Sequence, residues 1–469
     1  MAVALSGAAL AGAGSPTDPL LADPLPAFPG ALGYGRIATG WRGGEVVAVT
    51  NLRDRGPGSL RACAGRKGRG RAKGRVCVFR VSGTIRVDRT IRVASRTYIA
   101  GQTSPGGVQL RLGAAQNTPL AVRDATDVVV RHLALRPGPS RRPSPNVDAI
   151  IVEDARRVYL DHLSLAFATD ENLNVHSTKA ETADITVAHS IVALGLDRAN
   201  HPKGGHSKGA LICSGKPGRA RCGRITLFAN LFAHNRDRNP DVKATATGPV
   251  EVLGNVFYNP RSQFGEFYDL LGDTRIRYHG NLALAGPSTR ERPRPAAVEG
   301  FSRAPAHVFA IDAHDNRASI PPVCGSGRSG AVIDGTALPF LGGRWTGSGA
   351  VPPPAYVLPE RVLREAGART ALTPSGLDRL DARVVADVRR CSGRVIDRAA
   401  QVGGWPEQAV LPPPPDTDGD GMPDAWEARR GLDPHDAKDA WTPLETGLPG
   451  SLWPALELYL EERAAARRG

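Results

Sequence analysis

Six short segments in the middle of the chain alternate apolar and polar positions as half-buried β-strands do. They begin at Val128, Val158, Ile185, Ile225, Val250 and Ile276, and they read VVVRHLAL, VYLDHLSL, ITVAHSIV, ITLFANLF, VEVLGNVF and IRYHGNLA. β-Branched or aliphatic residues at every second position direct one face of such a strand into a core. The pattern therefore predicts six equivalent strands.

The spacing of these segments predicts how they are arranged. Their starts are separated by 30, 27, 40, 25 and 26 residues, and the intervals hold turn residues with too few helix formers for crossover helices. One such strand about every 25 residues is typical of a parallel β-helix, in which each coil stacks on the preceding one. The 40-residue interval predicts a loop inserted between the third and fourth coils, and it contains Cys213 and Cys222.

Stacking aligns equivalent positions of successive segments in columns. The fifth position of three segments and the sixth position of the other three hold polar side chains: His132, His162 and His189, then Asn230, Asn255 and Asn281. A metal site or a proton relay is one interpretation of the three histidines. We favour an internal ladder of hydrogen-bonded side chains at a bend in each coil, because aligned columns explain the histidines without a ligand.

Composition extends this picture to the whole chain. Among 469 residues, 54 glycines and 39 prolines indicate many tight turns and few long helices. The length predicts one large domain and a smaller one. The net charge of +14 favours a polyanionic partner, namely an acidic polysaccharide, a nucleic acid or an anionic membrane. No apolar run reaches the about 20 residues that span a bilayer, so we expect a soluble protein.

The chain contains an even number of cysteines: Cys63, Cys77, Cys213, Cys222, Cys324 and Cys391. They form no CxxC pair and have no histidine at zinc spacing, which favours disulfides over metal ligation. Neighbours in sequence suggest the pairs 63–77, 213–222 and 324–391, while other pairings and reduced thiols stay open. The N-terminal segment has a short apolar run and an AGA motif but no basic residue before Arg36, and we expect a secreted protein.

Oxygen ligands and cations follow the strand segments. Asp148 lies in SPNVDAI, and Asp170 and Asn174 lie in ATDENLNV. Because Ca²⁺ prefers about six to eight oxygen ligands, stacking of these side chains at one rim would leave positions for a substrate carboxylate. Ordinary surface acids are the alternative. Three cationic side chains come from the following coils: Lys208, Arg238 and Lys243.

Eight ordered motifs resemble those of a known enzyme family. They are GPGSLRA, VSGTIRV, IAGQTSPGG, VDAI, VYLDHLSLAFATDENL, HSKGALI, LFAHNRDRNPDV and LALAGPST. Their order over residues 31–405 resembles that of bacterial pectate lyases of polysaccharide lyase family one, with Tyr159 where the family usually has tryptophan. The resemblance implies an all-β, right-handed, single-stranded parallel β-helix that cleaves de-esterified pectin, α-1,4-polygalacturonate, by β-elimination.

The same resemblance implies roles for the oxygen ligands. Asp148 matches the aspartate of the family's first calcium motif, and Asp170 and Asn174 match the two acids of the second. Asparagine at position 174, and Asn146 where some members have an acid, remove negative charge. We therefore expect Ca²⁺ to be bound mainly together with the substrate.

The three cationic residues also match positions of the family's motifs. Arg238 in RNP matches the arginine of the R-x-P motif, which serves as the base; Lys208 matches a substrate-binding lysine, and Lys243 stands where a second arginine is usual. β-Elimination removes the C5 proton beside a uronate carboxylate, whose charge Ca²⁺ would neutralise. Ca²⁺ and Lys208 would also favour a neutral guanidine, which predicts optimal activity at alkaline pH.

A second module is predicted at the C-terminus. A polyproline linker, residues 406–415, precedes DTDGDGMPDAWE, which matches the calcium loop D-x-[DN]-x-[DN]-G-x5-E in full. The predicted ligands are Asp416, Asp418, Asp420, the backbone carbonyl of Met422, Asp424 and Glu427. The loop resembles the EF-hand-like loops of dockerins and thrombospondin type 3 repeats, but no second loop follows. We therefore expect a structural site in a module over 416–469, after a β-helix over 31–405 and an N-terminal segment over 1–30.

Two other functions stay open. A hydrolase acting on the same polymer would use paired carboxylates, but Asp170 and Glu171 are adjacent and would face opposite sides of a strand. A non-catalytic protein that binds an acidic polysaccharide or a nucleic acid would explain the charge but not Asp148, Asp170 and Arg238 in their motifs. The sequence thus favours a monomeric secreted enzyme acting on polygalacturonate, with Ca²⁺ as cofactor and neither a nucleic acid nor a membrane as partner.

Overall fold

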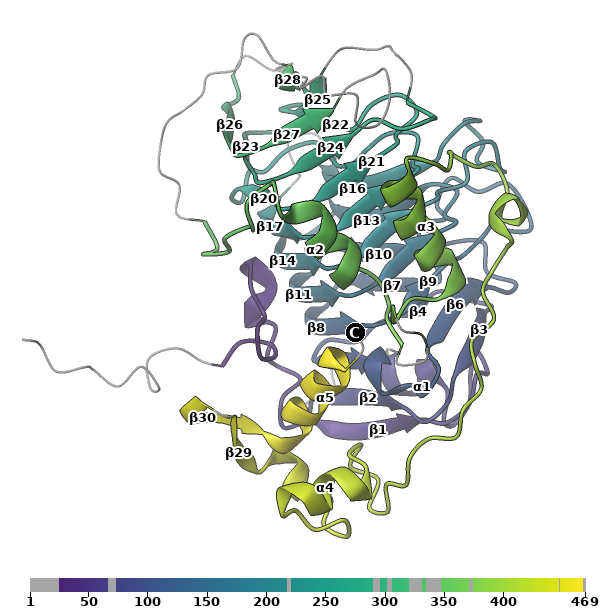
Figure 1. The fold of residues 1–469 in the computed structure, drawn as a ribbon, viewed down its shortest axis with the longest axis vertical. Helices are drawn as coiled ribbons and strands as arrows, with labels where there is room; N and C mark the ends of the chain where they lie inside the picture. The colour runs from purple at the N-terminus through teal and green to yellow at the C-terminus, as the bar shows by residue number, and fades with distance from the viewer. Residues whose placement is uncertain are drawn as a thin grey trace, which may run out of the picture.

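Three parallel β-sheets run along the molecule (Figure 1). The computed structural model describes residues 25–65, 73–216, 221–289, 296–301, 306–319, 331–334, 347–370, 373, 375–446 and 448–466. Successive strands of the chain enter the three sheets in turn, and each strand pairs in parallel with its equivalent in the next coil. The predicted parallel β-helix is confirmed.

Each sheet collects one strand from every coil. The first sheet contains β1 (Glu45–Val49), β2 (Arg75–Phe79), β5 (Thr97–Ala100), β8 (Thr126–Arg131), β11 (Arg156–Asp161), β14 (Thr182–Ala188), β17 (Cys222–Phe228), β20 (Val250–Leu253), β23 (Thr274–His279) and β26 (Phe309–His314). The second sheet contains β4 (Ile91–Arg92), β7 (Leu120–Arg123), β10 (Ile150–Glu153), β13 (Glu171–Ser177), β16 (Lys208–Gly215), β19 (Asp241–Val242), β22 (Gly265–Tyr268), β25 (Ala296–Phe301) and β28 (Ala331–Asp334). The third sheet contains β3 (Gly83–Val87), β6 (Val108–Leu112), β9 (Ala134–Leu135), β12 (Ser164–Ala166), β15 (Ile191–Ala193), β18 (Leu231–Ala233), β21 (Val256–Tyr258), β24 (Leu282–Leu284) and β27 (Arg317–Ser319).

Short helices and one antiparallel hairpin complete the described chain. They are η1 (Tyr34–Ile37), α1 (Leu60–Ala64), η2 (Gly101–Thr103), α2 (Leu358–Glu365), α3 (Arg379–Arg390), η3 (Ala399–Val402), α4 (Asp424–Arg430), η4 (Asp439–Trp441), β29 (Pro443–Thr446), β30 (Leu448–Pro454) and α5 (Ala455–Ala465). Within the described ranges, every helix is too short or too polar to cross a lipid bilayer. α1 adds Leu60 and Cys63 to the interior of the β-helix beside its first strands.

The six predicted strands stack in the predicted register. The paired residues of this column are Val128, Val158, Ile185, Ile225, Val250 and Ile276. All of them belong to the apolar interior of the coils. Because parallel pairing repeats in every coil, equal side chains lie above one another and pack into a continuous core.

The long interval holds an insertion between the third and fourth coils, as predicted. β15 ends at Ala193 and β16 begins at Lys208, so the inserted residues lie mainly between these strands, at 194–207. Cys213 lies inside β16, and Cys222 opens β17. The cysteines therefore join two adjacent strands and do not lie in the inserted segment.

Two of the suggested disulfides are confirmed. Cys63 pairs with Cys77, and Cys213 pairs with Cys222. Cys391 is also disulfide-bonded. Cys324, its suggested partner, lies outside the described residues, so that pairing stays a prediction.

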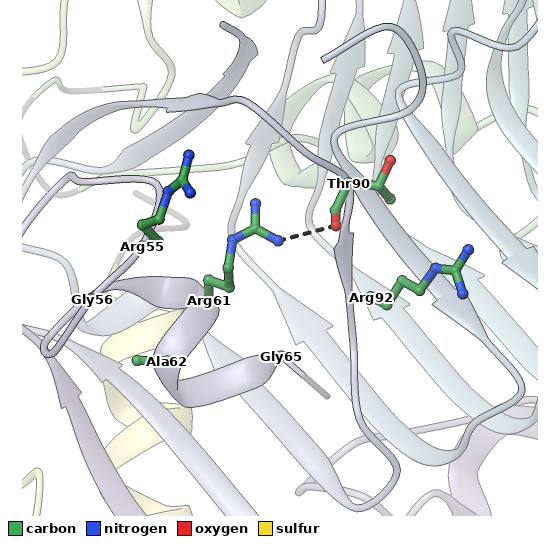
Figure 2. A pocket seen from close by; sticks show the side chains of 7 residues that line it. All are labelled: Arg55, Gly56, Arg61, Ala62, Gly65, Thr90 and Arg92. Atoms are coloured by element: carbon green, nitrogen blue, oxygen red, sulfur yellow. Dashed lines mark hydrogen bonds between the residues drawn. The ribbon is translucent and has the colours of Figure 1, made fainter. Parts of the chain in front are cut away.

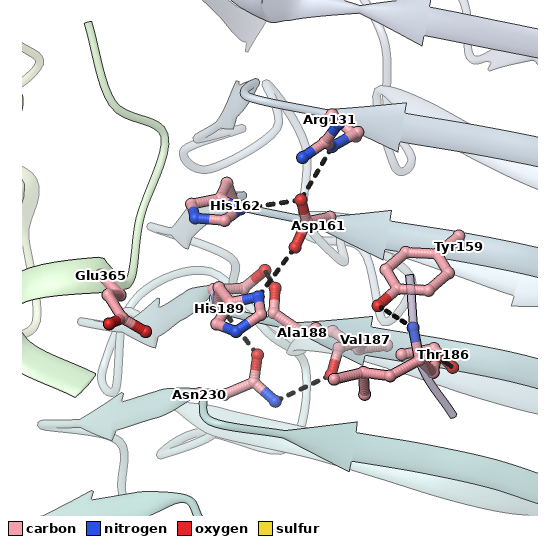
Figure 3. Close-up of polar contacts among 12 residues, drawn as sticks. Arg131, Tyr159, Asp161, His162, Thr186, Val187, Ala188, His189, Asn230 and Glu365 are labelled. Atoms are coloured by element: carbon pink, nitrogen blue, oxygen red, sulfur yellow. Dashed lines mark hydrogen bonds and ion pairs between the residues drawn. The ribbon is translucent and has the colours of Figure 1, made fainter. Parts of the chain in front are cut away.

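The histidine column forms a ladder at the bend that follows the first sheet. The rings of His132 and His162 stack with centroids 4.7 Å apart, and those of His162 and His189 with centroids 4.9 Å apart. The Asp161 carboxylate lies 2.7 Å from His162 Nδ1 and 3.0 Å from His189 Nδ1 (Figure 3). The three histidines have φ values of 54°, 51° and 47°, a left-handed conformation that such residues rarely adopt. The stacking and the bonds to Asp161 help hold this bend, as the ladder prediction expected.

The asparagine column continues the ladder in later coils. Asn230 Nδ2 donates to Asn255 Oδ1 at 3.0 Å, and Asn255 Nδ2 donates to Asn281 Oδ1 at 3.1 Å. Each of these amides also donates to a backbone carbonyl of the preceding coil. The side chains are buried, so the ladder satisfies polar groups that water does not reach.

The outward positions differ between the sheets. Outward side chains of the first and third sheets join an apolar cluster with residues of α2, α3 and the C-terminal segments. In Figure 1, α2 and α3 lie along the coils, and α4 and α5 lie beside β1 and β2. In the second sheet, one outward column contains Asn174, Asp241 and Glu266 beside the apolar residues Ala121, Ile151 and Leu211. A polar outer face marks the second sheet as the place to look for a functional site.

We predict that Asn255→Ala lowers the free energy of unfolding by about 2–4 kcal/mol, because it removes one rung and leaves buried amides and carbonyls without partners. Thermal or denaturant unfolding measures the change. Asn117→Ala, at an exposed amide outside the ladder, is the matched control. Equal stability of the two variants would show that the ladder contributes nothing.

Candidate functional site

Three carboxylates meet at the start of two neighbouring strands of the second sheet. Asp148 lies two residues before β10, Asp170 lies directly before β13, and Glu171 is the first residue of β13. β10 and β13 pair with Ile150 opposite Leu173, so Asp148 and Glu171 lie at the same level of adjacent coils. Oxygen atoms of the three carboxylates lie within 4.8 Å of one another.

Hydrogen bonds fix this carboxylate cluster, which we define as Asp148, Asp170 and Glu171. The Glu171 backbone N–H donates to Asp148 Oδ1 at 3.1 Å. Asn174 Nδ2 donates to Asp148 Oδ2 and to Glu171 Oε2, each at 3.4 Å. The structure thus brings the predicted residues Asp148, Asp170 and Asn174 together, whereas Asn146 is exposed on the preceding loop.

The cluster concentrates negative charge away from water. Burial raises the pKa of Asp148 well above its usual range, and Glu171 and Asp170 raise it further. Burial also raises the pKa of Glu171, with Asp170 adding to the effect, and burial raises the pKa of Asp170. Carboxylate and amide oxygens are the ligands that Ca²⁺ prefers, and repulsion among them is relieved by a cation. The donor set therefore fits this metal.

Arg238 reaches the carboxylate cluster from the next coil but one. Its guanidinium bonds to Glu171 Oε1, and its Nε lies 3.3 Å from Asp241 Oδ2. The side chain is 23% exposed. Arg238 therefore lies between the carboxylates and solvent, within reach of a ligand bound over the cluster.

Two carboxylates hold the proton of Arg238. Burial opposes its charge, but the carboxylates of Glu171 and Asp241 outweigh burial and raise the pKa of the guanidinium. The expected lowering of this pKa depends on Ca²⁺ acting together with Lys208, so it stays a prediction for the site with Ca²⁺ bound.

The two lysines flank the same region. Lys208 Nζ lies 2.8 Å from Asp237 Oδ2, and Lys208 is paired with Glu171 across β13 and β16. Lys243 Nζ lies 3.3 Å from Asp241 Oδ2 and 3.8 Å from the centroid of the Tyr268 ring. Aspartates hold both ammonium groups beside Arg238, so all three predicted cations line one site.

Sequence reasoning missed two kinds of site residue. Glu171 was set aside because alternation on a strand would turn it away from Asp170, but Asp170 precedes β13, so the rule does not apply between them. His201 and His206 come from the inserted segment: His206 Nε2 lies 2.8 Å from Asp170 Oδ1, and the two rings stack with centroids 3.8 Å apart. The 40-residue interval was the one feature of the sequence that indicated an insertion here, and it did not identify the two histidines as site residues.

A separate basic pocket lies three strands toward the N-terminus of the same sheet. Figure 2 shows its lining arginines, Arg55, Arg61 and Arg92, with Arg61 donating to the backbone carbonyl of Thr90 at 3.1 Å. Arg92 occupies the strand position that Asn174 occupies in β13. No carboxylate is among the described residues that line this pocket, so the pocket is separate from the carboxylate cluster. Its arginines extend the positive charge along the same sheet.

The C-terminal loop forms a second acidic cluster on the first sheet. Oxygen atoms of Asp416, Asp418 and Asp420 lie within 4.8 Å of one another. Asp424 differs from the predicted pattern because its carboxylate accepts from the Thr417 backbone N–H at 2.7 Å and from the Thr417 hydroxyl at 2.8 Å. The loop therefore keeps the predicted aspartates together while Asp424 fixes its entry.

Charge repulsion in the carboxylate cluster should destabilise the folded protein when no cation is bound. A carboxyl group with a raised folded-state pKa costs stability once pH exceeds that pKa, so Asp148→Asn should raise the melting temperature at pH 8 in chelator by on the order of a few degrees. Scanning calorimetry measures this.

The matched control, Asp154→Asn, should change the melting temperature in the opposite direction. Burial raises the pKa of Asp154, but hydrogen bonds from Lys179 and Thr178 outweigh burial and lower it, so Asp154→Asn should lower the melting temperature. A fall for both variants would argue against repulsion at Asp148.

Comparison with curated proteins finds fungal relatives. The chain is 32% identical over 421 residues to a protein named probable pectate lyase C from Neosartorya fischeri, which covers 88% of this chain and 89% of that protein. A protein of the same name from Emericella nidulans is 30% identical over 437 residues, with 90% of each chain covered. These relatives do not support the bacterial grouping suggested by the motifs. No family model matches the chain.

Solved structures share the fold. The crystal structure of jun a 1, the major allergen from cedar pollen, has a TM-score of 0.50 at 18% identity and covers 72% of this chain and 92% of that one. The thermostable pectate lyase PL 47 has a TM-score of 0.50 at 14% identity, with 72% and 96% covered. Likeness at this identity supports the β-helix alone.

Proposed function

This chain belongs to the pectate lyase family, and from that premise we propose that it cleaves α-1,4-polygalacturonate by Ca²⁺-dependent β-elimination with Arg238 as the base. It is an enzyme of the polysaccharide lyase class, which removes the hydrolase and the non-catalytic binder from the alternatives. The observation that carries the proposal is the bond between Arg238 and Glu171, which brings a guanidinium to a buried cluster of oxygen ligands.

The carboxylate cluster is the proposed metal site. Asp148, Asp170 and Glu171 would hold Ca²⁺, and Asn174, whose amide nitrogen now donates to Asp148 and Glu171, would add its oxygen after a flip of the amide. When bound, the ion would neutralise a uronate carboxylate and so lower the barrier to removing the neighbouring C5 proton. With three carboxylates instead of two, the protein supplies more charge than the motif comparison suggested, because Glu171 takes part.

Arg238 must lose its own proton before it accepts one from carbon. Glu171 and Asp241 hold that proton by their negative charge, so the resting guanidinium is charged. A cation that takes up the charge of Glu171 weakens this hold, and the pKa of Arg238 then falls. Glu171 would thus couple occupation of the cluster to the basicity of Arg238.

Lys208 and Lys243 would bind carboxylates of neighbouring sugar units. Their ammonium groups flank Arg238 and are held in place by Asp237 and Asp241. Arg92 and its neighbours extend positive charge along the second sheet. A polyanionic chain with one carboxylate per sugar suits such a row of cations better than a neutral polymer does.

We also propose that the enzyme is secreted. Two confirmed disulfides and a further bonded cysteine support an oxidising compartment. The substrate class is extracellular polymer, which agrees with export.

Incubation with polygalacturonate tests the reaction. We expect ultraviolet absorbance from the unsaturated product, its loss on adding chelator, and its return with excess Ca²⁺. New reducing ends without absorbance would mean hydrolysis, and no cleavage in either assay would mean that the proposal is wrong.

Arg238→Lys tests the base. It keeps a positive charge beside Glu171, so KM should change little while kcat falls by at least about 100-fold. Arg156→Lys, on the exposed side of the first sheet, is the control and should keep its activity.

The pH dependence of kcat tests which protonation state of Arg238 is active. Because only the neutral guanidine accepts a proton and the pKa of Arg238 is raised, wild-type kcat should rise with pH through the alkaline range. A profile that falls above neutrality, or a lysine variant with wild-type kcat, would remove Arg238 from this role.

A further inference from the structure

The loop 416–427 contains buried carboxylate oxygens with no partner in the described part of the chain. Glu427 is 0% exposed, and neither of its oxygens has a hydrogen-bond partner. Asp420 Oδ2 and Asp418 Oδ2 are buried and unpartnered as well. Buried charged oxygens without partners are costly, so this group points to a bound cation.

The loop is shaped before any ion enters. Backbone N–H groups inside the loop donate to Asp416 Oδ1 at 2.9 Å, to Asp418 Oδ1 at 3.1 Å and to Asp420 Oδ1 at 2.8 Å. Gly419 and Gly421 have φ values of 77° and 95°, which glycine adopts without strain. One oxygen of each aspartate thus fixes the turn, and the second oxygens of Asp418 and Asp420 are left for a ligand.

A carboxylate from outside the twelve-residue motif joins the cluster. Asp439, in η4, accepts from the Asp433 backbone N–H through Oδ2, while its Oδ1 is buried and unpartnered. Burial raises the pKa of Glu427 to about 8, with Asp420, Asp418, Asp439 and Asp416 adding to the effect. Asp439 is therefore close enough to act on the charge of Glu427, and its buried Oδ1 is free to serve as a further ligand.

The loop lies against the first coils of the β-helix. A side chain at Gly421 would meet Val46 and Val78 at 3.0 Å, and Met422 is fully buried in the cluster that includes Val76 and Val78. Arg80 Nη1 lies 3.1 Å from Asp416 Oδ2. Figure 1 shows α4 and α5 beside β1 and β2.

Other contacts dock the rest of this segment in the same place. Arg131 Nη1 lies 2.9 Å from Glu461 Oε2, and Arg42 bonds to Glu457. The rings of Trp41 and Trp441 lie with centroids 6.4 Å apart. The loop and Asp439 are therefore two parts of one docking surface on β1, β2, β5 and β8.

We propose that this loop binds one Ca²⁺ through Asp416, Asp418, Asp420, the Met422 carbonyl, Glu427 and Asp439, and that the ion locks residues 416–466 onto the first coils. Without the ion, docking buries like charges against apolar strands, which favours release of the segment. With the ion, the charges are balanced and the docked form is favoured by mass action. The site lies on the first sheet, so the proposal does not depend on the catalytic one.

Terbium binding to the full-length protein tests the ligand set. Trp426, next to Glu427, serves as the donor for Tb³⁺ luminescence, and Ca²⁺ competes for the site. Glu427→Gln should weaken Ca²⁺ competition by at least about tenfold, and Asp439→Asn should weaken it several-fold. Glu445→Gln, an exposed acid of the same segment, should behave as wild type. An Asp439→Asn variant with wild-type affinity would remove Asp439 from the set.

Hydrogen exchange on the wild type, with and without chelator, tests the lock and needs no variant to fold. Chelation should speed exchange in the backbone of β1, β2, α4 and α5, and Asp148→Asn should leave this response to Ca²⁺ unchanged. Unchanged exchange on chelation would show that Ca²⁺ does not hold residues 416–466 on the first coils. Loss of the response in Asp148→Asn would assign it to the carboxylate cluster.

Discussion

Parallel stacking in fixed register is the constraint on which the rest of the molecule depends. Each coil places the same strand position above its equivalent in the previous coil, about 4.8 Å away. Apolar columns such as the one through Val158 and Ile185 then form the core, and the polar column through Asn230 and Asn255 becomes a ladder. The same repetition places Asp148 and Glu171 at one level, although 23 residues separate them.

This repetition also explains why charge accumulates at the site. Neighbouring coils that each contribute a carboxylate bring like charges close, and only other coils can supply the compensation. Arg238 does so for Glu171, and Asp241 in turn balances Arg238 and Lys243. The C-terminal loop has Arg80 at its rim, but within the described ranges the Glu427 carboxylate has no hydrogen-bond partner. Of the two acidic clusters, the loop therefore has the less compensated negative charge, and a bound cation would stabilise it more in the absence of substrate.

The sequence was sufficient where periodicity governs the structure. Spacing predicted the strand register and the ladders, because each follows from a repeated local pattern, and it was the resemblance to family motifs that grouped Asp148, Asp170 and Asn174. Sequence reasoning failed at the strand ends. The alternation rule gave the wrong result at Glu171, because Asp170 stands before β13 and is not part of the strand. Asp439 and the docking of the loop on β2 join residues far apart in sequence, and no periodic pattern marks them.

The location of the site follows from what the rest of the chain covers. Tyr98 and Val129 point outward from the first sheet and are buried under C-terminal residues, whereas Leu231 and Val256 of the third sheet share that apolar cluster with α2 and α3. Apolar outer faces need such covers, because exposed patches of that size favour association. The second sheet instead presents charged and amide side chains, which water or a polyanion can solvate. The proposed polymer would therefore bind along the second sheet, and the segments that cover the first and third sheets would not obstruct it.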